Sequence, residues 1–364
     1  MSRVCLNLPV IRPSVRTGFP RRAAFLSFLL VVFIHFTGMG SQGDTVGHPG
    51  AFAWGANGHP INQEAYWGNM EAQMEVMKSI GLRYYRVDMP YSKDGVLDSV
   101  SAGRLDRLRE LAVRNGITIV PIIFLPGPML YEMDAETAYK SGFAAGSGFV
   151  HRYKDLFHYY EMGNENDADV IKPPAGDGSD TAQYDMARVR ILCSALKGMS
   201  DGIRQEDAKA SIIISNAGWM HYAYFQLLEQ EGVRFDIIGY HWYEDVRHLG
   251  AALDALNRYF PAKPVWFTEI NARNNGAGYS YHHQMARVRR YLKMIHRRGK
   301  TVTAVFIYEL FDQPANLSSR EKSYGLVSWE EPYKTYTFKP LAAFIRSWIR
   351  SRSMPVVSNR QEKK

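Results

Sequence analysis

The chain has 364 residues, of which 46% are hydrophobic and 22% charged, a composition typical of folded globular proteins and not of disordered or fibrous ones. The formal net charge of +8 is concentrated at the two ends: residues 1–40 and 346–364 contribute +5 each, which leaves −2 on residues 41–345. A nearly neutral body argues against a nucleic-acid-binding protein, so no nucleic-acid partner is expected.

Residues 1–40 have the parts of an export signal. Arg21 and Arg22 precede an apolar run of 14 residues, 23–36, and small residues follow it. This order is that of a secretory signal peptide. The run is shorter than the roughly 20 apolar residues of a membrane span, but the long segment before it keeps an uncleaved membrane anchor as an alternative. We expect an exported protein, periplasmic or secreted, which residues 23–36 could anchor to the inner membrane.

The sequence contains two cysteines, Cys5 and Cys193. Cys5 precedes the apolar run and would be lost with a signal peptide, so no intramolecular disulfide is expected. No Cys-x-x-Cys motif or Cys/His cluster with metal-ligand spacing occurs. His59 and His241 lack a third ligand at a suitable spacing. We therefore predict neither a catalytic metal nor another cofactor.

From about residue 50, apolar strand-like runs alternate with helical patterns. This alternation predicts parallel strands with right-handed crossovers, and eight such units close into a (β/α)8 TIM barrel. An open doubly wound sheet is the alternative, but the glycine-rich phosphate loop that often accompanies it is absent after the first strand. We predict one catalytic domain over residues 50–350 and a basic tail over 351–364. The expected strands are 52–57, 83–89, 117–124, 157–163, 210–216, 235–241, 265–270 and 304–310, and helices are expected at 69–80, 102–115, 284–298 and 341–350.

Side chains capable of chemistry lie at the end of almost every predicted strand. Charged groups are costly to bury without partners, and the carboxyl ends of barrel strands meet at one face, where barrel enzymes have their active sites. The clustering therefore predicts an active site at this face. Its candidates include Asn57 and His59, Arg86 and Asp88, the segment 161–167, Ser215 and Asn216, and the segments 240–243, 268–271 and 308–313.

Two carboxylates in this set suit the hydrolysis of glycosidic bonds. Glu165 follows the fourth predicted strand and Glu269 lies at the end of the seventh, so barrel closure brings them across the mouth from each other. A retaining glycosidase needs two carboxyl groups about 5–5.5 Å apart, one as nucleophile and one as general acid/base. The acid must hold a proton while the nucleophile stays ionised. We expect Arg86 to keep Glu269 charged.

The body resembles clan A of the glycoside hydrolases, the "4/7" barrel superfamily, over roughly residues 50–350. Asn164-Glu165 is similar to the acid/base motif of the clan, and Phe267-Thr268-Glu269 is similar to its nucleophile motif. The resemblance also implies that Arg86 lies near the nucleophile, and that His241 and Tyr243 orient it. Within the clan, the sequence is similar to families 39 and 5, without features that assign it to one of them. The resemblance implies a carbohydrate substrate and no cofactor.

The sequence departs from the clan pattern at two places. Asn166 follows the acid/base where many members have proline, and Tyr308 and Glu309 occupy a region where a tryptophan often stacks on the sugar. Glu309 is either a hydrogen-bond acceptor for sugar hydroxyls or a structural partner of an arginine. We expect Glu161 to be structural, paired with an arginine or histidine inside the barrel. Further substrate-binding candidates are His59 and Trp242, and at most two of Trp54, Trp219, Trp242 and Trp266 are expected to line a cleft.

The interpretation of these residues is a retaining glycosidase that hydrolyses β-linked bonds in a poly- or oligosaccharide through a covalent glycosyl-enzyme intermediate. Two alternatives remain open at this point. The first is a barrel that binds carbohydrate without cleaving it, and the intact glutamate pair argues against that. The second is a transglycosidase, which forms the same intermediate and differs in the acceptor.

Overall fold

The computed structural model describes residues 52–174, 176–273, 279–313, 321–331 and 333–353. The predicted signal or anchor, residues 1–40, lies outside these ranges, as does the predicted basic tail from residue 354 on. Within the described ranges, no helix combines the length and the apolar character needed to cross a membrane.

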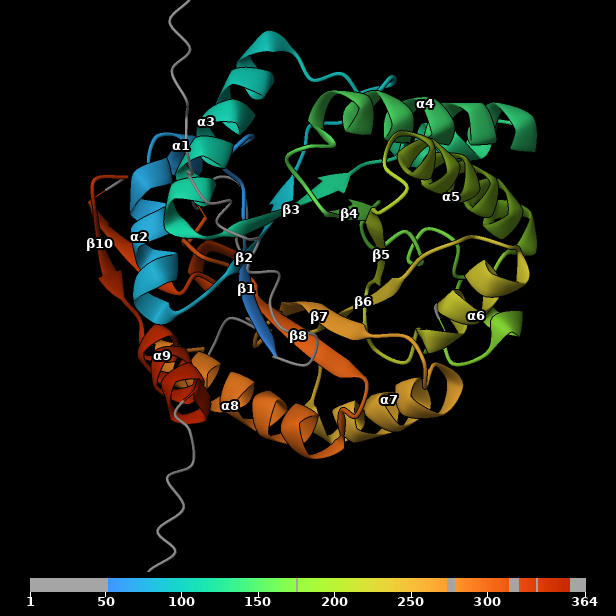
Figure 1. The fold of residues 1–364 in the computed structure, drawn as a ribbon. Helices are drawn as coiled ribbons and strands as arrows, with labels where there is room; N and C mark the ends of the chain where they lie inside the picture. Colours follow the sequence, from blue (N-terminus) through green and yellow to red (C-terminus); the bar gives the residue numbers. More distant parts are fainter. Residues whose placement is uncertain (1–51, 175, 274–278, 314–320, 332, 354–364) are drawn as a thin grey trace, which may run out of the picture. The chain divides into compact units, whose positions relative to one another are not determined.

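Eight parallel strands form a closed barrel in which each strand pairs with the next in sequence and the eighth pairs with the first. The predicted TIM barrel is therefore confirmed, and each of the eight strands overlaps its predicted segment. Figure 1 shows the strands at the centre of a ring of helices. The strands are β1 (Ala53–Gly58), β2 (Tyr84–Asp88), β3 (Thr118–Ile123), β4 (Tyr159–Met162), β5 (Ser211–Asn216), β6 (Ile237–Trp242), β7 (Val265–Ile270) and β8 (Val302–Ile307).

Helices cover the outside of the barrel, and the four predicted ones correspond to α2, α3, α8 and α9. Figure 1 shows α8 between α7 and α9 along one side of the ring. The helices are α1 (Glu64–Trp67), α2 (Met70–Ile80), α3 (Ser99–Asn115), α4 (Ala135–Tyr153), α5 (Met186–Glu206), α6 (Tyr222–Gln230), α7 (Val246–Tyr259), α8 (Tyr281–Arg298) and α9 (Pro340–Ser353), with short 3-10 turns η1 (Gly127–Glu132), η2 (Thr181–Gln183) and η3 (Glu321–Ser323).

Local sequence explains where several of these helices begin and end. A short oxygen-bearing side chain before the first turn accepts hydrogen bonds from backbone N–H groups that have no partner within the helix. Gly81 and Gly116 end α2 and α3 in the left-handed conformation, which glycine adopts without steric cost. The residues that cap helix starts in this way are Asp98, Asp134, Asp185, Asp245 and Ser280.

An apolar plug fills the part of the barrel interior nearest the strand starts. Trp266 lies at its centre, with ring centroids 4.8 Å from Tyr159, 5.7 Å from Tyr84 and 5.6 Å from Phe306. A side chain at Gly55 would collide with the Phe306 ring, so glycine makes room for the plug. This layer closes the barrel at the end where the strands start. The polar side chains of the next layer therefore face the opposite end, where the strands finish.

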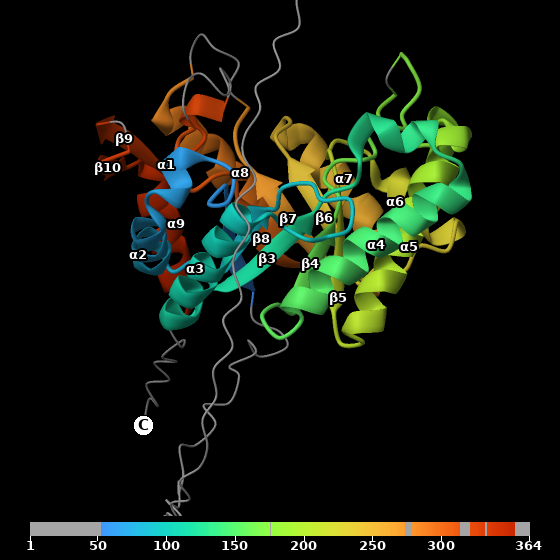
Figure 2. The same cartoon turned by 90° about the horizontal axis from the view of Figure 1, so that it is seen from above.

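A two-stranded antiparallel hairpin that the sequence did not predict lies between β8 and α9. It consists of β9 (Val327–Glu331) and β10 (Thr335–Phe338), and in both views it lies at the outer edge of the ring, on the side of α1 and α2 (Figures 1 and 2). Trp329 of the hairpin stacks on Phe311 at 4.7 Å, and Lys339 forms a buried ion pair with Asp312 at 2.5 Å. These contacts fix the chain after β8 against the barrel.

Candidate active site

Arg86 is the hub of the polar layer above the apolar plug. Its side chain points inward from β2 and is buried. Nε and Nη2 donate to the two oxygens of Glu161 at 2.6 and 2.7 Å, and Nη1 donates to Glu269 Oε1 at 2.6 Å. Further hydrogen bonds run to Asn57 Oδ1 at 2.8 Å and Asn164 Oδ1 at 2.6 Å. The two carboxylates outweigh the effect of burial and raise the pKa of the guanidinium, so it stays charged.

Glu161 forms the pair with an arginine inside the barrel that the sequence predicted. Its carboxylate is fully buried on β4 and forms a bidentate pair with Arg86, the arrangement in which an arginine and a carboxylate bind most specifically. Glu161 is thus a structural partner that holds the guanidinium in one orientation. That orientation directs Nη1 toward Glu269.

Glu269 faces the barrel interior because β7 is irregular. Strict alternation would put Trp266 and Glu269 on opposite faces of the strand, since they are three residues apart. The pairing with β6 shifts register between Trp266 and Glu269, and the pairing with β8 shifts between Phe267 and Ile270. An irregularity of this kind re-aims a side chain, so both Trp266 and Glu269 point inward.

Both oxygens of Glu269 have hydrogen-bond donors. Oε1 accepts from Arg86, and Oε2 accepts from the hydroxyl of Tyr243 at 2.6 Å. Burial and the charge of Glu269 raise the pKa of Tyr243 well above its usual value, so the hydroxyl keeps its proton and acts as a donor. These two donors hold the carboxylate in one orientation, as a nucleophile requires.

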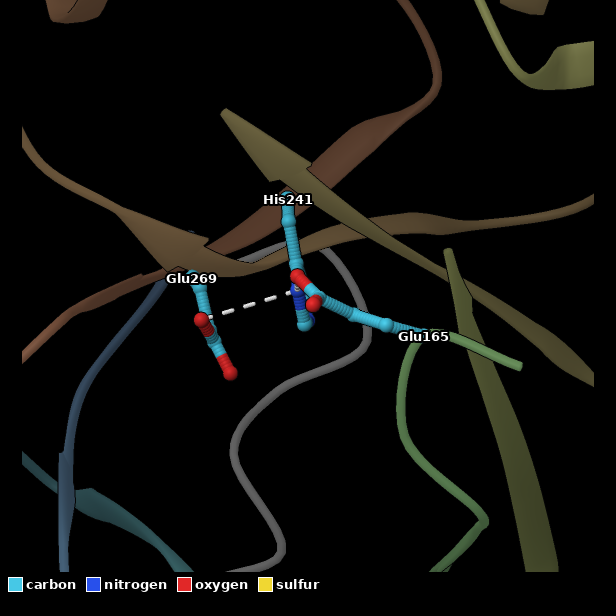
Figure 3. A group of neighbouring side chains, drawn as sticks. All are labelled: Glu165, His241 and Glu269. Atoms are coloured by element: carbon cyan, nitrogen blue, oxygen red, sulfur yellow. Dashed lines mark hydrogen bonds and ion pairs between the residues drawn. The ribbon is translucent and has the colours of Figure 1, made fainter. Parts of the chain in front are cut away.

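Glu165 lies in a tight turn after β4. Gly163 and Glu165 both have positive φ angles, 69° and 50°. The first suits glycine, whereas the second is uncommon for any other residue and is often found where the surrounding structure constrains a functional side chain. The Glu165 side chain is about one third exposed and points toward His241 and Glu269 (Figure 3).

His241 lies between the two glutamates (Figure 3). Its Nδ1 is 2.6 Å from Glu165 Oε1 and 3.5 Å from Glu269 Oε2. Burial opposes protonation of the ring, but the charge of Glu269 and the hydrogen bond with Glu165 outweigh it and raise the pKa of His241. Ligand atoms of the three side chains lie within 4.8 Å of one another. The resemblance had implied that His241 orients the nucleophile, but its shorter contact is with Glu165.

A second histidine and a buried aspartate hold the turn that carries Glu165. Asp167, fully buried, accepts the backbone N–H of Ala217 at 2.9 and 3.1 Å and contacts Nδ1 of His221. A side chain at Gly178 would collide with the His221 ring, so the loop after β4 packs against that ring. Sequence reasoning placed Asp167 in the strand-end cluster without a role and did not select His221, although both follow neighbouring strands.

Another cluster of polar side chains lies where β1, β2 and β8 end. His59 bridges two acids, with Nδ1 2.8 Å from Asp88 and Nε2 3.2 Å from Glu309. Glu309 is fully buried and also accepts from the hydroxyl of Tyr66 at 2.8 Å. Burial raises the pKa of Glu309 to about 7 despite the nearby histidine. Its partners are therefore a histidine and a tyrosine, not the arginine that the sequence suggested.

The predicted site residues divide into two groups. Glu165, Glu269, Arg86, Asn164, His241 and Tyr243 are joined by direct contacts, and His59 and Glu309 form the neighbouring group. Trp242 is the exception, because its side chain is fully buried in the core outside the barrel. Trp54 and Trp266 are buried as well, whereas Trp219 is partly exposed in the loop after β5. The expectation of a substrate-binding Trp242 is therefore replaced by a packing role.

Glu165, His241 and Glu269 have the ligand types and the proximity that a metal ion requires. Their hydrogen bonds favour another use. Both oxygens of Glu269 already accept from Arg86 and Tyr243, and the guanidinium 2.6 Å away repels a cation at the same carboxylate.

Residues 202–330 match the model of a family described as glycosyl hydrolase catalytic core. Among solved structures, the chain is similar to a family 1 β-glucosidase from Thermotoga maritima, with 11% identity and a TM-score of 0.65 over 84% of this chain and 99% of that one. The complex of a β-glucosidase from the same organism with noeuromycin gives 11% identity, the same coverage and a TM-score of 0.67. The β-glycosidase BGL167 gives 12% identity and a TM-score of 0.61 over 84% of this chain and 97% of that one.

At these identities the structural likeness shows the barrel fold, and the family match adds the enzyme class. A search of curated proteins found no match. The comparisons agree with the resemblance that the sequence suggested.

Proposed function

We propose that this chain, a glycoside hydrolase with a barrel of the clan A type, cleaves β-glycosidic bonds with retention of anomeric configuration. In this proposal Glu269 is the nucleophile and Glu165 the general acid/base. The substrate is a poly- or oligosaccharide.

The separation of the two carboxylates carries the proposal. One oxygen of Glu165 and one of Glu269 lie within 4.8 Å of each other. Retaining glycosidases have their carboxyl groups about 5–5.5 Å apart, whereas inverting enzymes need about 6.5–9.5 Å to place a water between acid and base. This close approach of the two carboxylates fits the retaining arrangement better than the inverting one and favours direct attack by one carboxylate.

In the first step Glu269 attacks the anomeric carbon from the face opposite the leaving group. The bond from that carbon to the glycosidic oxygen breaks, and the proton of Glu165 moves to this oxygen. Arg86 and Tyr243 orient the Glu269 carboxylate before the attack. Glu269 loses its negative charge as the ester forms, so its electrostatic attraction for His241 weakens. Glu165, the other carboxylate next to His241, becomes ionised in the same step.

In the second step Glu165 acts as a base. It takes a proton from a water molecule, whose oxygen attacks the anomeric carbon, and the ester to Glu269 breaks. Both glutamates return to their initial states. Two inversions give net retention, and a sugar hydroxyl in place of water would give transglycosylation.

The β-configuration of the substrate is supported by the names of the similar structures, which are β-glucosidases and a β-glycosidase.

The exposure of the two glutamates supports their assigned roles. The partly exposed Glu165 is reached from the barrel mouth, where a leaving sugar would lie, while Glu269 lies deeper.

Chemical rescue separates the two roles. On an aryl β-glycoside accepted by the wild type, Glu269→Ala with added azide is expected to release an α-glycosyl azide, because azide replaces the nucleophile. Glu165→Ala with azide is expected to release a β-glycosyl azide, because azide then attacks the glycosyl-enzyme. Glu110→Ala, a change at an exposed acid of α3 on the outside of the barrel, serves as the control.

Two results would overturn the assignment. Full activity of Glu269→Ala without azide would exclude Glu269 as the nucleophile. An enzyme that binds glycans but turns over no glycoside in a broad panel would favour the carbohydrate-binding alternative.

We also propose that the protein is exported, on the basis of the Arg21–Arg22 pair and the apolar run at 23–36. Fractionation of expressing cells tests this, since the protein is expected outside the cytoplasm, either free or with the inner membrane. Recovery in the cytoplasm with an intact amino terminus would contradict it.

A further inference from the structure

Helix α8 concentrates positive charge in a body that is otherwise acidic. Residues 279–300 include seven lysines and arginines and no aspartate or glutamate. Since residues 41–345 carry −2 in total, the remainder of that segment carries −9. The near-neutral sum therefore conceals a strong separation of charge.

The cations of α8 share its outward side. Val288, Leu292 and Ile295 face the core. The exposed residues Arg290, Lys293 and Arg297 follow at spacings of three and four, which places them in one row along a helix. Arg289 lies beside this row, and we call these four residues the basic face.

The basic face has no acidic partner among the described residues. Two other arginines of α8 do have one, since Arg287 lies 3.5 Å from Asp245 and Arg298 pairs with Asp254, both acids of the α7 side. The four residues of the basic face form no such ion pair within the described parts of the chain. Their charge is therefore directed to solvent, where an anionic partner can reach it.

The position of the basic face indicates which partner fits. The cations occupy the second half of α8, which leads down to the start of β8, and so lie toward the end of the barrel opposite Glu165 and Glu269. The chain enters the barrel at that same end, because Ala53 of β1 pairs with Ala304 of β8. The apolar run at 23–36 precedes this entry point by fewer than 20 residues.

We propose that the basic face docks the barrel on an anionic phospholipid surface with the active-site mouth turned away from it. Lysine and arginine side chains near such a surface each add to the attraction, and the effect decays within a Debye length. An acidic polysaccharide that extends out of the active site would need cations next to the active-site mouth. The basic face lies toward the other end of the barrel. A lipid surface at the entry of the chain agrees with both observations.

Vesicle co-sedimentation of the full chain tests this. The vesicles are phosphatidylcholine alone, or phosphatidylcholine with phosphatidylglycerol as the minor component, at about 0.05 and about 0.5 M salt. The variant Arg290→Gln/Lys293→Gln/Arg297→Gln is compared with Lys93→Gln/Lys140→Gln/Lys172→Gln, which removes the same charge from exposed sites on the side of the barrel where the strands end. Thermal unfolding confirms that both variants are folded.

The wild type is expected to bind the anionic vesicles more tightly than the neutral ones, and high salt should remove the difference. Each lost cation should weaken this anionic preference about fivefold, and three should weaken it about 100-fold. The control variant should keep the preference to within a few fold. Equal binding by the two variants would overturn the proposal, and so would a wild type that prefers soluble polygalacturonate or DNA to the anionic vesicles.

Discussion

Arg86 binds both oxygens of Glu161 through parallel hydrogen bonds of 2.6 and 2.7 Å inside the barrel. The same guanidinium binds Glu269, so one buried cation is shared by a structural carboxylate and the proposed nucleophile. Folding and catalysis thus depend on the same contacts.

Replacing Arg86 is therefore expected to reduce stability as well as activity. Arg86→Met leaves two carboxylates buried without a cation, and removing one partner of a buried pair costs about 3–5 kcal/mol. Arg86→Lys keeps a charge but cannot reproduce the bidentate geometry, so it should lose less stability and still lose activity. Urea unfolding measures the stability of the two variants and an assay on an aryl glycoside measures their activity, with Arg258→Met as an exposed control. A stability for Arg86→Met equal to that of the control would contradict this account.

Tyr243→Phe removes the donor to Glu269 Oε2 and leaves the ring in place. A hydrogen bond to a charged group contributes about 1.5–3 kcal/mol, so kcat should fall about 10–100-fold while the fold is retained. Tyr160→Phe removes a buried hydroxyl that donates to the backbone carbonyl of Phe157, near the start of β4, and should leave kcat unchanged. Steady-state kinetics on an aryl glycoside compares the two. Equal effects of both changes would mean that the Tyr243 hydroxyl has no specific role.

Asp167→Asn is expected to act through Glu165, because Asp167 holds the turn on which Glu165 lies. A misplaced general acid matters most when the leaving group is a poor one. Loss of activity should therefore increase with the basicity of the leaving group and be small for a dinitrophenyl glycoside. Asp169→Asn, an exposed acid of the same turn, is the control. Equal loss for good and poor leaving groups would indicate a general folding defect instead.

The pair of His59 and Glu309 predicts how stability changes with pH. Burial raises the pKa of Glu309 to about 7, so the folded state holds a proton that the unfolded chain releases near pH 4.5. This proton adds about 3 kcal/mol to the free energy of unfolding. The stabilisation is fully present below about pH 4.5 and is lost as pH rises through about 7. The raised pKa of His59 acts in the same direction. Glu309→Gln should flatten the decline, and Glu75→Gln, an exposed control, should not. Unfolding free energies that rise with pH over this interval would refute the prediction.

Chelation should leave activity unchanged. Glu165, His241 and Glu269 could hold a metal ion, but Arg86 and Tyr243 already occupy the oxygens of Glu269. Prolonged dialysis against EDTA followed by an assay is the measurement. Activity lost on dialysis and restored by a divalent cation would favour metal-assisted hydrolysis.

The order of the strands and the positions of Glu165 and Glu269 at strand ends were predictable, because apolar runs and the residues that follow them are local features of the sequence. The inward direction of Glu269 was not, since it depends on a register shift in β7 that no local pattern reveals. The burial of Trp242 follows from alternation on β6, where His241 points inward and its neighbour outward.

Contacts between distant segments escaped prediction for a different reason. Asp167 and His221 are 54 positions apart and meet because β4 and β5 are neighbours, and Tyr66 reaches Glu309 across 243 positions. The sequence showed that these residue types lie near strand ends but not which of them pair. The hairpin β9–β10 was missed because its apolar residues follow the eighth strand, after the barrel pattern is complete.

The most direct test of the glutamate assignment is trapping of the intermediate. A dinitrophenyl 2-deoxy-2-fluoro-β-glycoside of the sugar found in the substrate panel should inactivate the enzyme, because the fluorine slows breakdown of the glycosyl-enzyme more than release of the good leaving group. Mass spectrometry of the digested protein should then find the sugar on Glu269. A label on any other residue, or release of a product with inverted configuration from the natural substrate, would contradict the account.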